Sequence, residues 1–431
     1  MKLFTRLPLS VVLLFSCAVT VLAQGTKYEA ENGTLTGGLS VQTSVTGYSG
    51  TGYVEIFQNE GDAVTVTFSL AQEGWYRLFI GYAGPYGDKK NILGINGNSS
   101  EVSFPASATF TEVSFGRIWL REGSNTLSMT ESWGWFLLDY FRIEPDNTPE
   151  ITVQLPYSLS TPSPHRETRR LWSYLMDSFT HNIHSGAMSL NAREEAEWLF
   201  SQTGKYPALI GLDFMNHNRN YSWYDKSVVV SEARDWYNRN GLVAICWHWR
   251  DPSRATDEFY TSGTSFDVSK ITETTSAEYQ AMLSDIDIIA GYLKQLNNDK
   301  IPVLFRPLHE ASGGWFWWGA KGPEPCKMLW RLMFDRLVNH HGLKNLIWVW
   351  TTDAAANSLD WYPGDEYVDI LGADIYASDG DFSSQVLTYN AIREKFGGRK
   401  MITLSENGPV PDPDLLVADR AHWSWFMPWS G

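Results

Sequence analysis

The chain has 431 residues and a formal net charge of −15, from 49 acidic and 34 basic side chains. A surface this acidic repels nucleic acid and anionic membranes, so neither is expected as a partner. The length allows two or three domains and a large hydrophobic core.

Residues 1–23 have the pattern of a secretory signal peptide. Lys2 and Arg6 supply positive charge, an apolar run follows, and Val21 and Ala23 are the small residues that precede a cleavage site. We therefore expect a secreted, extracellular mature protein. No other uninterrupted apolar run is long enough to span a bilayer.

Two cysteines remain after this segment, Cys246 and Cys326, and they either form one disulfide or stay as buried thiols. Asn32, Asn98 and Asn220 each begin an N-x-S/T sequon. Glycosylation at these positions is expected if the host is eukaryotic.

Residues 24–146 show short alternating runs separated by glycine and asparagine. In "AVTVTFSL" every second residue from Val64 to Leu70 is apolar, and "WYRLFIGYAG" repeats the pattern. "INGN" at Ile95–Asn98 is typical of a hairpin turn. This pattern predicts an all-β, jelly-roll-like sandwich. The proline-rich segment 147–164 is expected to be a stiff linker.

Residues 165–431 alternate strand-like and helix-like runs. Eight strand-like runs recur, at 183–190, 206–214, 242–249, 302–310, 346–350, 368–376, 401–408 and 422–429. One long helix has apolar residues at 282, 286, 289, 293 and 296, which form a single face. Eight such units predict an α/β TIM barrel. A doubly wound open sheet is disfavoured because no glycine-rich phosphate loop follows a strand.

The eighth barrel helix would follow the last predicted strand. The sequence reaches Gly431 at that point, so we expect a barrel that lacks this C-terminal helix or is completed in another way.

Two glutamates stand at the ends of predicted barrel strands. Glu310 ends the fourth strand and Glu406 ends the seventh. Reactive residues of TIM barrels lie at carboxyl strand ends, and these two strands lie on opposite sides of the mouth. Facing carboxylates can cleave a glycosidic bond, one as a proton donor and one as an ionised nucleophile.

The residues around these glutamates suggest which one has which role. Arg306 shares a strand face with Glu310 and needs a carboxylate partner if it is buried. We expect that partner to be Glu406, which would then stay ionised as the nucleophile. His309 and nearby aromatic residues would suit a raised pKa for the acid Glu310.

Tryptophans are concentrated around the predicted strand ends, where their indole rings could stack on sugar rings. They are Trp315, Trp317 and Trp318 after the acid, Trp247 and Trp249 at the third strand, and Trp425 and Trp429 in the eighth. An aromatic-rich mouth with paired acids indicates a carbohydrate site.

The sequence gives less support for a catalytic metal site or for a catalytic serine. His309-Glu310 begins like the zinc motif H-E-x-x-H, but the fifth residue is Gly313. No other His, Cys and carboxylate group has ligand spacing, and no nucleophile elbow is present. We therefore expect no cofactor for catalysis.

The motifs "FRPLHEASGGWFWWG", "GADIYAS" and "TLSENGPVPDPD" resemble glycoside hydrolase family 26, chiefly endo-β-1,4-mannanases. The resemblance implies a retaining TIM-barrel enzyme with Glu310 as acid/base and Glu406 as nucleophile. It implies a substrate-binding set of His248, Arg306, His309, Trp315, Asp369, Asp374, Tyr376 and Trp429. The expected substrates are mannan, galactomannan and glucomannan.

The N-terminal motifs "YEAENG", "SGTGYV", "GWYRLFIGYA", "INGN" and "LLDYFRI" resemble carbohydrate-binding module family 35. This resemblance implies a structural calcium held by Glu29, Glu31 and Asp139. For carbohydrate binding we expect contributions from Tyr82, Lys89, Asn125, Trp133 and Trp135.

The leading hypothesis is a secreted, monomeric endo-β-1,4-mannanase that acts on mannan-type polysaccharides. Two alternatives stay open: a β-glucanase or xylanase on the same scaffold, and a non-catalytic carbohydrate-binding protein.

Overall fold

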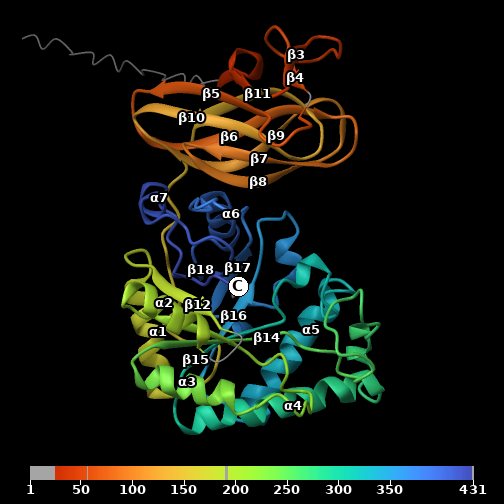
Figure 1. The fold of residues 1–431 in the computed structure, drawn as a ribbon, viewed down its shortest axis with the longest axis vertical. Coiled ribbons are helices and arrows are strands. Elements are labelled where there is room, and N and C mark those ends of the chain that lie inside the picture. The colour runs from red at the N-terminus through yellow and green to blue at the C-terminus, as the bar shows by residue number, and fades with distance from the viewer. Residues whose placement is uncertain (1–24, 56, 190–192, 430–431) are drawn as a thin grey trace, which may run out of the picture.

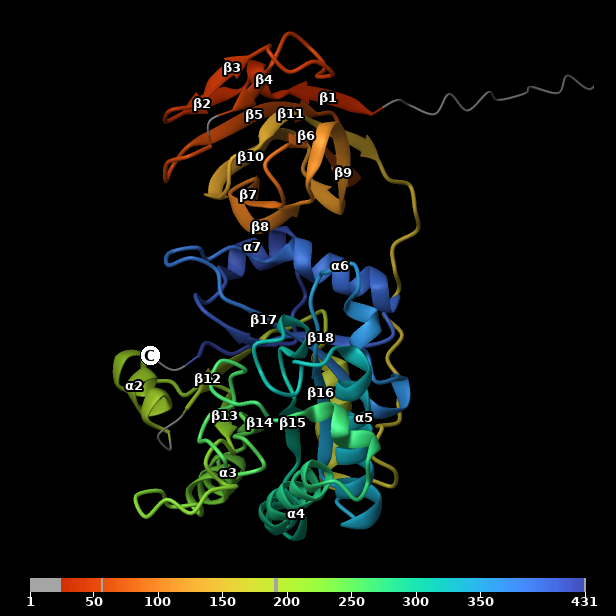
Figure 2. The ribbon, with the colours of Figure 1, turned by 90° about the vertical axis from the view of Figure 1, so that its right-hand side faces the viewer.

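The computed structural model describes residues 25–55, 57–189 and 193–429. The predicted signal peptide lies outside these residues. Figure 1 shows two domains, a β-rich domain above an α/β domain. The connecting chain, residues 147–164, has no helix or strand and runs down one side of the α/β domain in Figure 2.

The N-terminal domain is a sandwich of two antiparallel sheets, as predicted. One sheet has the order β3-β4-β11-β6-β9, with β1 also paired to β11, and the other has the order β2-β5-β10-β7-β8. The strands are β1 (Thr26–Glu29), β2 (Thr34–Thr36), β3 (Ser40–Gln42), β4 (Tyr53–Glu55), β5 (Ala63–Leu70), β6 (Gly74–Gly84), β7 (Lys89–Ile95), β8 (Asn98–Phe104), β9 (Ser107–Leu120), β10 (Gly123–Trp133) and β11 (Leu137–Pro145). Val64, Val66 and Phe68 of β5 are buried between the sheets, because every second side chain of a strand faces the same side.

The second domain is an eight-stranded parallel barrel, in which every predicted strand is present. Its strands are β12 (His184–Met188), β13 (Leu209–Asp213), β14 (Leu242–Trp247), β15 (Val303–Pro307), β16 (Leu346–Thr351), β17 (Ile370–Ile375), β18 (Met401–Asn407) and β19 (Trp425–Phe426). β19 pairs with β12, and a bridge from Asn407 to Pro428 joins it to β18. The sheet thus closes with no helix between Phe426 and Trp429, the last described residue.

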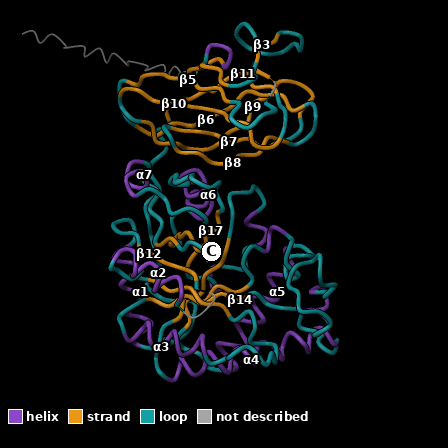
Figure 3. Tube along the Cα trace, in the orientation of Figure 1, coloured by secondary structure: helices purple, strands orange, loops and turns teal. Residues whose placement is uncertain are grey.

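Helices surround the barrel strands, and Figure 3 contrasts this helical layer with the almost helix-free upper domain. The α-helices are α1 (Arg166–Ser178), α2 (Glu194–Thr203), α3 (Val228–Asn238), α4 (Ala277–Asn298), α5 (Pro323–Phe334), α6 (Val386–Phe396) and α7 (Pro413–Ala418). Short 3-10 turns cover Ala30–Asn32, Val268–Thr272, Ala311–Gly313, Ser358–Trp361 and Asp365–Tyr367, and a π-helical turn covers Asp335–His340.

The predicted long helix is α4. Its N-cap Ser276 accepts a hydrogen bond from the backbone N–H of Tyr279, which satisfies one free donor of the first turn. The five apolar residues of its predicted face are all buried.

α1 closes the amino end of the barrel. Its residues Trp172 and Leu175 belong to the same buried cluster as Ile347 and Ile370, which lie inside the strand ring. With this end filled, the carboxyl ends of the strands form the accessible mouth.

Both cysteines of the described chain are buried and free, so the disulfide alternative is wrong. Among the three sequons, Asn98 is only 5% exposed, whereas Asn32 and Asn220 are exposed. Asn98 is therefore a poor acceptor in the folded protein. None of the described helices combines the length and apolar character required to cross a bilayer.

The two domains are in direct contact. In Figure 2, β8 and β9 lie above α7 and α6, and α6 contacts β9. Leu387 of α6 packs against the core of the sandwich, and the Arg420 guanidinium lies 3.9 Å from the Trp119 ring centre. Side-chain packing and a cation–π contact therefore link the domains.

Candidate active site

Glu406 lies at the carboxyl end of β18 and is almost completely buried, at 5% exposure. The hydroxyl of Tyr376 donates to its Oε1, and an Arg306 N–H donates to its Oε2. The predicted pairing of Arg306 with Glu406 is confirmed. Both oxygens of Glu406 thus accept hydrogen bonds, and one of the two donors carries a positive charge.

Arg306 projects from β15 and serves a second carboxylate. Its Nη1 donates to Asp374 Oδ2 at 2.6 Å, and Ser405 Oγ donates to Asp374 Oδ1 at 2.6 Å. Burial raises the pKa of Asp374 to about 7, against the opposing charge of Arg306. Asp374 and Glu406 therefore bond to different nitrogens of the arginine.

Glu310 follows β15, and its backbone is in the left-handed region at φ 52°. Leu308 is also left-handed, at φ 51°. Non-glycine residues seldom adopt this conformation, and such strain is concentrated at functional sites. Burial and the nearby charge of Glu406 raise the pKa of Glu310, while a hydrogen bond from Trp315 Nε1 to its Oε2 at 2.9 Å opposes this effect.

The two carboxyl groups thus have different surroundings. Glu406 has a cationic donor, whereas burial and the negative charge nearby favour the protonated form of Glu310. Two carboxyl groups in different surroundings can take different roles, one as proton donor and the other as nucleophile.

Two histidines lie beside the carboxyl pair, His248 after β14 and His309 after β15. Their Nε2 atoms are 3.1 Å apart. Burial lowers the pKa of His309 well below its usual value, which favours a neutral imidazole.

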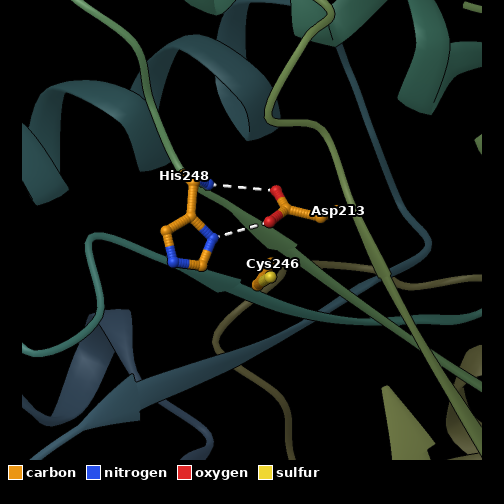
Figure 4. A group of neighbouring side chains, drawn as sticks. All are labelled: Asp213, Cys246 and His248. Atoms are coloured by element: carbon orange, nitrogen blue, oxygen red, sulfur yellow. Dashed lines mark hydrogen bonds and ion pairs between the residues drawn. The ribbon is translucent and has the colours of Figure 1, made fainter. Parts of the chain in front are cut away.

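Asp213, at the end of β13, positions His248. Its Oδ2 lies 2.6 Å from His248 Nδ1, and its Oδ1 accepts the His248 backbone N–H at 3.0 Å (Figure 4). Cys246 lies next to this pair, and one ligand atom from each of the three residues falls within 4.8 Å of the others. The spacing of these three residues along the sequence did not indicate the group, because its members come from two different strands. Since both Asp213 oxygens already accept hydrogen bonds, we interpret it as an aspartate–histidine pair.

The tryptophans that were expected to stack on sugar rings differ in their exposure. Trp315 is 46% exposed next to Glu310, and the Trp429 ring centre is 5.3 Å from that of His248. The other proposed stacking residues are fully buried and belong to the core: Trp247, Trp249, Trp317, Trp318 and Trp425. Phe259 and Phe316, which the sequence did not single out, contact the His248 ring instead.

Asp369 is a correction. It precedes β17, so it lies at the amino end of a strand whose carboxyl end carries Asp374 and leads to Tyr376. Its two oxygens accept backbone N–H groups of Ser160 and Trp348. Asp369 therefore fastens the interdomain segment to the barrel on the side opposite the mouth.

Comparison with known proteins agrees with this geometry. The profile of glycosyl hydrolase family 26 matches residues 160–431, and that of carbohydrate binding module family 35 matches residues 26–146. The chain belongs to glycosyl hydrolase family 26. It is a glycoside hydrolase with a family 35 module at its N-terminal side.

Several relatives share both parts of this family 26 protein. A mannan endo-1,4-beta-mannosidase of Thermothelomyces thermophilus is 44% identical, over 94% of this chain and 84% of its own length. Mannan endo-1,4-beta-mannosidase B of a Piromyces species is 36% identical, over 98% and 75%. The crystal structure of the Podospora anserina GH26-CBM35 beta-(1,4)-mannanase aligns with a TM-score of 0.63 at 40% identity, covering 94% of this chain and 91% of that one.

In the family 35 module, two expected carbohydrate contacts are wrong. Tyr82 is 3% exposed, and its hydroxyl donates to the Pro105 carbonyl. Asn125 is 1% exposed, and its amide is fully used in the turn at Arg121 and Gly123. Both side chains stabilise the sandwich.

The other expected module residues form an accessible group. Trp133 is 64% exposed, and Lys89 Nζ lies 5.1 Å from its ring centre. Trp135 is half-buried, and its ring centre lies 5.3 Å from that of Tyr86. Tyr86 is 59% exposed and was not singled out in the sequence. Two indoles, a phenol and an ammonium thus share one surface of the module.

The three expected calcium ligands all bond to one turn of the module, Ser49–Thr51. Ser49 donates to both Glu29 and Asp139, and the Thr51 backbone donates to Glu31. Burial raises the pKa of Asp139 to about 6, and the charge of Glu29 adds to it. Glu31 Oε2 is buried without a hydrogen-bond partner among the described residues. Hard oxygen ligands with one unsatisfied atom fit a calcium ion.

Proposed function

We propose that this chain hydrolyses internal bonds of mannan-type polysaccharides by retaining double displacement, with Glu406 as nucleophile and Glu310 as acid/base. Family membership and the relatives agree on the activity: the chain is an endo-β-1,4-mannanase. Its reaction needs no cofactor. The observation that carries the mechanism is the shared arginine: it hydrogen-bonds Glu406 and Asp374, while burial and the charge of Glu406 raise the pKa of Glu310.

In the first step, Glu406 attacks the anomeric carbon and the bond to the leaving sugar oxygen breaks. Glu310 gives its proton to that oxygen, and a mannosyl ester forms on Glu406. In the second step, Glu310 takes a proton from water, which attacks the same carbon and releases Glu406. The Trp315 indole N–H orients Glu310 in both steps.

The exposed aromatic residues would bind the substrate. Trp315 lies beside the acid, where it can stack on the sugar beyond the scissile bond. His248, His309 and Trp429 form a cluster of rings beside the carboxyl pair, where they would contact the sugar at the cleavage point.

The module would bind carbohydrate on the surface formed by Tyr86, Lys89, Trp133 and Trp135. Flat aromatic faces stack on sugar rings, and the ammonium can bond to hydroxyl groups. Glu29, Glu31 and Asp139 would hold a calcium ion that neutralises their mutual repulsion and fastens β1 to β11. The calcium would stabilise the module and take no part in hydrolysis.

We also propose that the mature protein is secreted and monomeric. The basic and apolar pattern of residues 1–23 supports export. The acidic net charge supports solubility as a monomer.

The test is reducing-sugar release from galactomannan by the wild type and by Glu310→Ala and Glu406→Ala, with β-glucan and xylan as parallel substrates. We expect activity on galactomannan alone and near-complete loss in both variants. NMR of the first product should show the β anomer, since retention preserves configuration. Preferred cleavage of glucan or xylan, or an α product, would contradict the proposal.

A further inference from the structure

The module touches the barrel at a loop that leads to the active site. We propose that the family 35 module has a second function: it braces the β17–α6 loop (residues 376–385), and this bracing positions Tyr376 on the nucleophile. The module would thus assist catalysis independently of any carbohydrate that it binds.

One end of this loop belongs to the active site. Tyr376 is its first residue, and the Tyr376 hydroxyl donates to Glu406. The side chain is 55% exposed, so little core packing restrains its ring. Its position therefore depends on the backbone that carries it, which Gly408 holds at one side by donating to the Ile375 carbonyl.

The other end of the loop belongs to the domain interface. Ser99 Oγ of the module donates to Asp381 Oδ2 at 2.7 Å, and Ser383 Oγ donates to the Ser99 carbonyl at 2.9 Å. The Ser384 backbone N–H donates to Asn98 Oδ1 at 3.1 Å. All of these contacts come from the first two residues of β8, which Figures 1 and 2 place over this part of the barrel.

The contact of Ser384 with Asn98 is buried, and the two contacts of Ser99 are partly buried. Asn98 is 5%, Ser383 3% and Ser384 0% exposed. Buried hydrogen bonds are stronger than exposed ones, and a buried donor that loses its partner is costly. The segment between the two ends, Ser378–Gly380, is exposed and has no such support.

The barrel holds the same segment from its inner side. Ser384 Oγ donates to Asp419 Oδ2 at 2.7 Å, and Trp423 Nε1 donates to the Ser384 carbonyl at 2.9 Å. The far end of the loop is therefore clamped between module and barrel. Loss of the module contacts should loosen the loop and slow catalysis without abolishing it.

The experiment compares the full-length wild type with Asn98→Ala/Ser99→Ala, on mannohexaose as a short soluble substrate. Production in bacteria leaves Asn98 unglycosylated. Ser103→Ala is the matched control, because Ser103 is an exposed serine of the same strand. We expect kcat to fall about threefold to tenfold, the effect of one or two lost hydrogen bonds. KM and the control should change less than twofold.

A double-mutant cycle with Tyr376→Phe separates bracing from general damage. If the module acts through the Tyr376 hydroxyl, adding Asn98→Ala/Ser99→Ala to Tyr376→Phe should cost little more than Tyr376→Phe alone. Unchanged kcat in Asn98→Ala/Ser99→Ala, or fully additive losses, would overturn the inference. If that variant melts below the assay temperature, Ser99→Ala alone is measured by the same criteria. An inactive wild type would instead refute the proposed activity.

Discussion

Asp213→Asn tests whether a buried aspartate sets the proton positions of the two active-site histidines. Asp213 Oδ1 accepts the backbone N–H groups of His248 and Met215 at 3.0 and 2.8 Å, and Oδ2 faces His248 Nδ1 at 2.6 Å. With this partner, His248 carries its proton on Nδ1, and its Nε2 accepts from His309. An asparagine that keeps Oδ1 in place presents an N–H to His248 Nδ1. Both imidazoles must then move their protons to the other nitrogen.

The expected loss follows from the hydrogen bond that is removed. A hydrogen bond to a charged group contributes about 1.5–3 kcal/mol. Since each 1.4 kcal/mol is about tenfold, kcat/KM on galactomannan should fall about 10-fold to 150-fold. The measurement is initial-rate kinetics, with thermal melting to follow stability.

Asp369→Asn is the matched control. Asp369 is also a buried aspartate that accepts backbone N–H groups, but it lies at the opposite end of the barrel. It should lower the melting temperature and leave kcat/KM within twofold. Activity of Asp213→Asn within threefold of wild type, or an equal loss in Asp369→Asn, would refute the reasoning.

Three further predictions concern titration. Trp315→Phe removes a hydrogen bond that lowers the Glu310 pKa, so the alkaline limb of the kcat/KM–pH profile should move to higher pH. Asp374→Asn removes a negative charge close to Glu310, so the same limb should move to lower pH; a shift in the same direction in both variants would contradict this. The third concerns Asp139, whose folded pKa of about 6 exceeds the usual 3.8. The fold therefore favours the protonated carboxyl of Asp139. This contribution to the free energy of unfolding is fully present below pH 3.8 and is lost as the pH rises through about 6. At 1.36 kcal/mol per pKa unit it amounts to about 3 kcal/mol. Melting curves should therefore show a larger calcium stabilisation at pH 7 than at pH 5, and Asp139→Asn should remove the difference.

The sequence predicted those parts of the site that depend on strand periodicity. The alternation in "LFRPLHE" placed Arg306 toward the barrel mouth, and charge balance then required a carboxylate partner. The structure contains that pair. The eight barrel strands were predictable for a different reason. A strand of a parallel sheet that is buried on both faces appears in the sequence as a continuous apolar run.

Outside the periodic strands, the sequence alone could not show where individual side chains lie. Trp317 and Trp318 follow the acid in a loop, where no rule states which side chains turn inward, and both are buried. Asp369 and Asp374 are five residues apart, yet the limits of β17 place them at opposite ends of one strand. Asp213 is 35 residues before His248, and only the pairing of β13 with β14 brings them together.

The arrangement around Arg306 explains how similar carboxylates take different roles. The guanidinium gives one nitrogen to Asp374 and another to Glu406, and burial at 6% exposure keeps it there. Both of these contacts hold the arginine on the Asp374 and Glu406 side of the site. Burial and the charge of Glu406 raise the pKa of Glu310, which suits a proton donor. Because only one guanidinium nitrogen reaches Glu406, its charge is not fully neutralised, and its other oxygen bonds only to the neutral Tyr376 hydroxyl. The charge-assisted bond from Arg306 is the stronger of the two, so the position of the Glu406 carboxylate depends mainly on the arginine.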